Sequence, residues 1–367
     1  MNRYMNHRDP GRIEMIPSGN VTAGTIGTWR FVFTAGPEGI KRGGGIRLLI
    51  PNGFSPPIVL PNGWPPKDSE LNANDIKEFI PCDLGFVTVR CSVSQRIVGF
   101  RTMDPDESFK HSVRGQNGCF FFVLIEQGFL PAEQMMELTY GDPVTGSVGV
   151  VTPSISQTVE FSCAVDPEGL RDGPDGGFWP ITSPVLKVLG SKLDHWECIA
   201  SSQPDREGML KVIAVPRDRY NNPCSEVHTV LSVSVEGQKA RNENVHIGRG
   251  WKMAVRLENL RISEKPSRIT VRDEKNKLCC VSNPVGGPRP DSMNLYWGDL
   301  HCHTSPYSGR DLVEELFKHA LGVSCLDFCA FTPHEDFPIK LSQGPWEMAQ
   351  EVSAHYNQPD HFVTFIG

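Results

Sequence analysis

Three residues able to bind a metal ion recur at every second position of the string Y-W-G-D-L-H-C-H-T: Asp299, His301 and His303. In an extended strand this period places the three side chains on one face, with Leu300 and Cys302 on the other. Such polar groups are costly to bury unless a partner satisfies them, and neutral imidazole is the commonest protein ligand for zinc and similar ions. The spacing therefore indicates a cation site at the end of a strand.

The residues that follow predict a strand–helix–strand unit that would position this site. A helix beginning at Ser308 or Asp311 is expected to run through Ala320, and a buried strand over 326–332 leads to His334. A crossover of one helix favours parallel strands. Both histidine clusters are then expected at the carboxyl end of the sheet, where (β/α) barrels carry their active sites.

This arrangement resembles the PHP superfamily of polymerase and histidinol phosphatase domains, and specifically a bacterial PHP-like family with the same string, Y-W-G-D-L-H-x-H-T. The resemblance extends over roughly residues 279–367 and implies a distorted (β/α)7 barrel with phosphoesterase activity. His301 and His303 match the ligands of the first family motif, and His334 matches the histidine of the second. The resemblance implies two or three Zn, Mn or Fe ions whose bound water attacks phosphorus. Asp299 is expected to orient an imidazole or hold the strand end.

Two positions depart from the family pattern. Pro333 stands where an acidic residue usually precedes the second-motif histidine, and Gly309 stands where many members carry a His or Asp ligand. A metal-bridging glutamate and later histidines would lie beyond Gly367. The resemblance therefore implies an N-terminal fragment of a hydrolase, inactive by itself and active only in a full-length protein.

Two other functions remain open from the sequence. An amidohydrolase-type enzyme also places H-x-H at a first barrel strand and hydrolyses C–N or C–O bonds. A non-catalytic binding protein with a degenerate barrel would instead use its β domains, and the departure at Pro333 favours it.

Composition restricts the partners and the compartment. From Asp291 onward there are 11 acidic and 3 basic residues, a net charge of −8, which suits cations and disfavours nucleic acid. No apolar run reaches the ~18–20 residues of a membrane span, and no signal peptide is visible, so a cytoplasmic location is expected. The 11 irregularly spaced cysteines indicate reduced thiols. The expected partner is a small-molecule substrate such as a phosphate ester, with the oligomeric state left open.

The fold class predicted from these patterns is multidomain, β followed by α/β. Alternating apolar residues such as Trp29, Phe31 and Phe33 predict strands over most of the first 285 residues. We expect two β-sandwich-like domains followed by the start of the PHP-type distorted (β/α)7 barrel. The predicted boundaries are a polar arm (1–20), a β-rich domain (21–165), a linker (166–180), an immunoglobulin-like β domain (181–287) and the truncated PHP-like domain (288–367).

Overall fold

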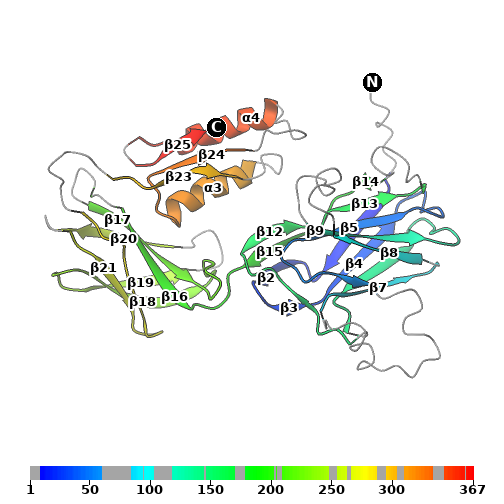
Figure 1. Ribbon diagram of the computed structural model, residues 1–367, viewed down its shortest axis with the longest axis horizontal. Helices are drawn as coiled ribbons and strands as arrows, with labels where there is room; N and C mark the ends of the chain where they lie inside the picture. The colour runs from blue at the N-terminus through cyan, green and yellow to red at the C-terminus, as the bar shows by residue number, and fades with distance from the viewer. Residues whose placement is uncertain are drawn as a thin grey trace. The chain divides into compact units, whose positions relative to one another are not determined.

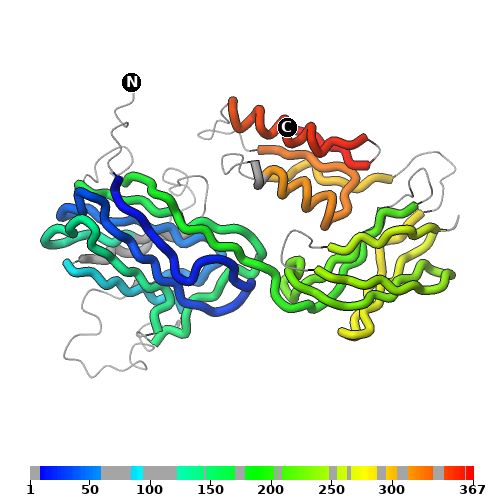
Figure 2. The backbone as a smooth tube through the Cα atoms, turned by 180° about the vertical axis from the view of Figure 1, so that it is seen from behind, coloured from blue at the N-terminus to red at the C-terminus, as the bar shows by residue number. Residues whose placement is uncertain are grey.

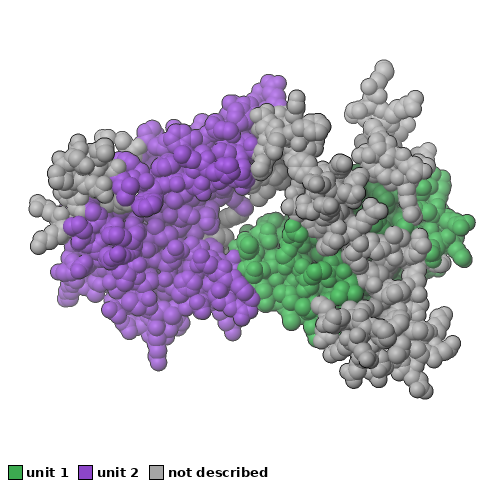
Figure 3. All heavy atoms as spheres, in the orientation of Figure 1, with its two compact units in different colours: residues 1–189 green, residues 190–367 purple. Residues whose placement is uncertain are grey.

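The computed structural model describes residues 9–59, 84–93, 95–102, 118–143, 146–169, 178–201, 204, 209–247, 254–262, 266–286, 295–303, 310–333, 343–359 and 361–367. The chain divides into two compact units, residues 1–189 and 190–367 (Figure 3). Each unit has its own hydrophobic core.

Unit 1 is built from strands, and its two larger sheets each contain five of them (Figure 1). The first sheet has the order β1-β4-β10-β7-β6, with bounds Gly11–Ile16, Trp29–Ala35, Met135–Tyr140, Phe86–Cys91 and Ile58–Val59. The second has the order β14-β13-β5-β9-β8, with bounds Trp179–Pro180, Cys163–Asp166, Gly45–Pro51, Gly118–Ile125 and Gln95–Thr102. The described part of the unit also contains two small sheets: β12 (Gln157–Glu160), β15 (Val185–Leu189) and β2 (Gly19–Thr22), and the pair β11 (Val150–Val151) and β3 (Ile26–Gly27).

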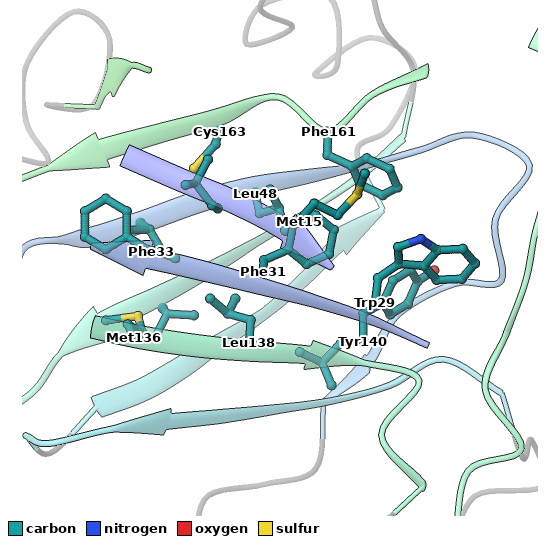
Figure 4. Close-up of a cluster of buried hydrophobic side chains, with 14 of the residues drawn as sticks. Met15, Trp29, Phe31, Phe33, Leu48, Met136, Leu138, Tyr140, Phe161 and Cys163 are labelled. Carbon is teal, nitrogen blue, oxygen red and sulfur yellow. The ribbon is translucent and has the colours of Figure 1, made fainter. Parts of the chain in front are cut away.

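The core of unit 1 lies between the two five-stranded sheets. Trp29, Phe31 and Phe33 alternate along β4 with half-buried or exposed neighbours, and all three are at most 2% exposed. They pack with side chains of β5 and β10 such as Leu48 and Leu138 (Figure 4). The period of two therefore turns these three aromatic side chains towards the second sheet and places Val32 on the outer face.

Unit 2 begins with a smaller sandwich. One sheet has the order β16-β17-β20 (His195–Ala200, Met209–Arg217, Val255–Arg261), and the other β19-β18-β21-β22 (Arg241–Ile247, Val227–Val235, Ile269–Asp273, Leu278–Val281). β17 differs from a half-buried strand because residues 212–216 are buried without interruption. Its second face is covered: Ile213 and Val215 form a separate apolar cluster with Val323 and Cys325 of the following α/β segment.

The α/β segment of unit 2 is a three-stranded parallel sheet with the order β23-β24-β25 (Gly298–Cys302, Phe328–Phe331, Val363–Ile366). Two crossover helices, α3 (Arg310–Gly322) and α4 (Gln343–Tyr356), contact each other and the sheet (Figures 1 and 2). Val313 and Phe317 of α3 and Val352 of α4 share one core with Cys329 and Phe331 of β24. None of the described helices is long and apolar enough to cross a membrane.

The predicted fold class is wrong in its barrel. Strands in many small sheets dominate the described chain, and the α/β segment is an open sheet of three strands with its helices in one core. A (β/α) barrel needs seven or eight strands closed into a ring. One strand–helix–strand unit, even when it is predicted correctly, therefore does not predict a barrel. β15, which follows the predicted linker 166–180, pairs with β12 and β2 of unit 1.

Candidate functional site

The two histidines of the H-x-H string meet at the carboxyl end of β23. Their rings are 4.5 Å apart between centroids and stand at 89°, and the two Nε2 atoms are 2.8 Å apart. Both residues are exposed. The spacing of two along a strand thus brings these imidazoles together, as the sequence predicted.

A backbone carbonyl orients one ring of the pair. Nδ1 of His303 lies 2.5 Å from the carbonyl oxygen of Thr332, which can only accept, so Nδ1 donates this hydrogen bond. The hydrogen bond between the two Nε2 atoms places one proton between them, and this proton would have to leave before both nitrogens could bind one cation.

Asp299 serves the backbone in this structure. Its Oδ1 accepts a hydrogen bond from the backbone N–H of His301 at 2.9 Å. This bond, followed by one from the Cys302 thiol, holds the pKa of Asp299 below its ordinary value. Of the two roles expected for Asp299, this bond corresponds to holding the strand end and not to orienting an imidazole.

The expected division of β23 into a polar and an apolar face also fails. Leu300 is 60% exposed, and the pairing with β24 is irregular between Asp299 and Cys302. Among the described strands β23 has a neighbour on one side only, and its burial does not alternate. The irregular pairing disturbs the alternation along β23, so the exposure of its side chains does not follow the period of two.

The Cys302 side chain packs against Cys329 and does not join the imidazole pair. Its sulfur lies 3.6 Å from the sulfur of Cys329. Burial, together with hydrogen bonds to Cys329 and Asp299, raises the pKa of Cys302 to about 12. A thiol that stays protonated at neutral pH is a poor metal ligand.

The described residues do not fit the metal cluster of a hydrolase. Within them no group of three or more His, Cys, Asp or Glu side chains is arranged to hold a metal ion. His334, the third predicted ligand, lies outside the described residues. Metal binding by His301, His303 and His334 therefore stays a prediction, and we derive no catalytic step from it.

Sequence reasoning missed a second feature of this segment, a set of exposed large apolar residues. They are Leu295 (40% exposed), Tyr296 (59%), Trp297 (55%), Leu300 (60%) and Phe365 (49%). The signal is present in the letters L-Y-W and F-V-T-F-I-G, which the sequence by itself links only to the family resemblance.

Comparisons with known proteins give no family for the chain. No family model and no curated protein matches it. Solved structures that are similar include the D00-D0 domain of intimin (8% identity, 76% of this chain and 100% of that chain, TM-score 0.25). The D0-D1 domain of intimin also matches (6% identity, 76% and 98%, TM-score 0.21). A third is AggA, the major subunit of aggregative adherence fimbriae type I from Escherichia coli (13% identity, 50% and 95%, TM-score 0.21).

We therefore correct the PHP resemblance and what it implied. TM-scores this low define no shared fold, but neither these structures nor any family model supplies a PHP protein or an enzyme family. The described site brings two imidazoles together without a third ligand. The predicted metal-dependent hydrolase, phosphoesterase or otherwise, and its small-molecule substrate have no support. A short H-x-H string beside a crossover helix involves too few residues to predict a hydrolase fold or its activity.

Proposed function

We propose that this chain is a non-catalytic binding protein that holds a partner polypeptide on the face of the β23–β24–β25 sheet opposite the helices. The concentration of exposed aromatic residues on and beside these three strands carries the proposal. Exposed apolar groups that gather on one element mark interaction sites, and Trp and Tyr dominate the binding energy of protein interfaces.

The two faces of this sheet differ in what covers them. Cys329 and Phe331 are completely buried in the core shared with α3 and α4. Because side chains alternate along a strand, Phe328 points to the other face. There it packs edge-to-face with Phe365, with 6.2 Å between ring centroids, and Phe365 remains 49% exposed. This face therefore offers aromatic surface that the described chain leaves open.

The backbone beside the patch is held in place. The N–H of Trp297 donates to Oδ2 of Asp327 at 2.9 Å, and the N–H of Asp327 donates to the Trp297 carbonyl at 2.7 Å. A residue fixed in this way loses little conformational entropy on binding. Among the described strands β23 and β25 are each paired on one side only, so a partner strand could also extend the sheet.

The test uses a peptide-display library selected on the immobilised wild-type protein. Selected peptides should carry alternating apolar residues, and Phe365→Ser should weaken their binding at least tenfold, since hot-spot aromatics contribute about 2 kcal/mol or more. Val281→Ser is the matched control, because Val281 is 51% exposed on β22 of the same unit. Selected peptides that bind both variants equally, or a selection that enriches none, would refute the proposal.

A further inference from the structure

A cavity lined by both polar and apolar side chains opens on the outer face of the first sheet of unit 1. Its volume is about 430 Å³, at the small end of ligand pockets, which span about 300–1,000 Å³. Strands β4, β10 and β7 supply its floor, since their apolar side chains turn into the core and their polar ones turn outward. The polar lining comprises Thr28, Arg30, Arg90, Glu137, Thr139 and Asp142.

One of the two arginines is neutralised by the protein and the other is not. Arg30 forms an ion pair with Glu137 at 3.2 Å. Arg90 lies directly opposite Glu137 in the β10–β7 pairing, yet it has no hydrogen bond or ion pair within the described residues. A guanidinium in this position presents a planar set of donors that matches a carboxylate.

Hydroxyl and carboxylate groups line the other end of the cavity. Asp142 is only 5% exposed and accepts a hydrogen bond from the Thr88 hydroxyl. Thr139 sits opposite Thr88 in the register, and its hydroxyl has no partner in the part of the chain that the structure describes. These groups can exchange hydrogen bonds with the hydroxyls of a ligand.

The strand register gives the distance between the two ends. Thr88 and Arg90 are two residues apart on β7, about 7 Å at about 3.4 Å per residue. The carboxylate of Asp142 accepts from Thr88 and that of Glu137 pairs with Arg30, so each negative group of the lining has a donor of its own. Ile16 and Pro17 add an apolar wall. The cavity thus has one cationic end, one hydroxyl-binding end and one apolar side.

We propose that this cavity binds a sugar acid, a single hydroxylated ring bearing one carboxylate. The carboxylate lies on Arg90, ring hydroxyls bond to Thr139 and Asp142, and the less polar ring face rests against Ile16 and Pro17. This site is independent of the peptide-binding face proposed for unit 2.

The test measures binding of D-glucuronate, D-galacturonate and N-acetylneuraminate by ligand-observed NMR and calorimetry, with D-glucose and acetate as matched probes. At least one sugar acid should bind at least tenfold more tightly than glucose and acetate, because only it engages both ends. Arg90→Gln should weaken that binding about tenfold or more, as expected for loss of a hydrogen bond to a charged group. Thr139→Val should weaken it about threefold or more.

Arg12→Gln is the control, because Arg12 is an exposed arginine of the same sheet that pairs with Glu133 at 3.6 Å and does not line the cavity. It should leave the affinity unchanged. The proposal is overturned if no sugar acid binds at 10 mM, if acetate binds as well, or if Arg90→Gln and Arg12→Gln act alike. Circular dichroism of each variant shows whether the sheet is retained.

Discussion

Replacement of Asp273 by alanine should strongly destabilise unit 2. This carboxylate, 1% exposed at the end of β21, accepts hydrogen bonds from Trp196 Nε1 at 2.9 Å and from the Thr229 hydroxyl at 2.7 Å. It also accepts bonds from the backbone N–H of Asn276 at 3.1 Å and from its side-chain amide at 2.8 Å. One side chain thereby ties β16 and β18 to the turn between β21 and β22.

The magnitude follows from what each donor does after the substitution. Asn276 is exposed and can turn to water, whereas Trp196 and Thr229 are buried, at 4% and 8% exposure. Leaving a buried donor without an acceptor costs about 1–3 kcal/mol. The two together give a loss of about 4 kcal/mol in the free energy of unfolding, a large part of the roughly 5–15 kcal/mol of a typical domain.

Hydrogen–deuterium exchange measures this loss separately in each unit. Peptides from β18 and β21 should lose protection in Asp273→Ala while those from β4 and β10 keep it. Glu274→Ala is the control, since Glu274 is the exposed neighbour in the same turn. A change below about 1 kcal/mol, or an equal change in the control, would contradict the assignment of Asp273 as a structural centre.

Burial raises the pKa of Asp273 and of Asp218, but the hydrogen bonds that these carboxylates accept outweigh burial and hold each pKa below the ordinary 3.8. Unit 2 should therefore keep its full stability above about pH 5 and lose stability as the pH falls below about 4. Acid unfolding of unit 1 before unit 2 would contradict this prediction. In calorimetric titration, His301→Ala and His303→Ala should each lower the affinity for Zn²⁺ at least tenfold, whereas the control His361→Ala, at an exposed histidine, should not. Unchanged Zn²⁺ affinity in all three variants would rule out the imidazole pair as a ligand set. Gly298→Val should destabilise the three-stranded sheet by about 1–3 kcal/mol, because a Cβ at Gly298 would lie 2.2 Å from the Phe328 ring. An unchanged unfolding temperature would contradict this packing.

Local patterns in the sequence predicted local structure well. The alternation of Trp29, Phe31 and Phe33 corresponds to β4, and the predicted helix ending at Ala320 corresponds to α3. The meeting of His301 and His303 is likewise a consequence of spacing along one strand. Each of these depends on residues that are neighbours in the chain, where period and steric preference act directly.

These local patterns do not predict which strands pair when they are far apart in the chain. β2 lies beside β15, about 165 residues later, in a parallel pair that no turn connects. Pairing of this kind depends on which apolar faces can be buried together, and that is decided by the whole unit. The same reason explains why a strand–helix–strand unit was extended into a barrel: a three-stranded and a seven-stranded parallel sheet begin with the same local signals.

The sugar-acid cavity shows how a site can be absent from any motif. Arg30, Arg90 and Glu137 come from three strands separated by dozens of residues, and nothing in their spacing relates them. The register of β4, β10 and β7 brings the three side chains to one face of the sheet, and the side-chain geometry then pairs Glu137 with Arg30 although Arg90 lies directly opposite it. A short motif such as H-x-H draws attention because its members are adjacent in sequence. Binding chemistry requires adjacency in space, and in a sandwich that adjacency is created by strand pairing.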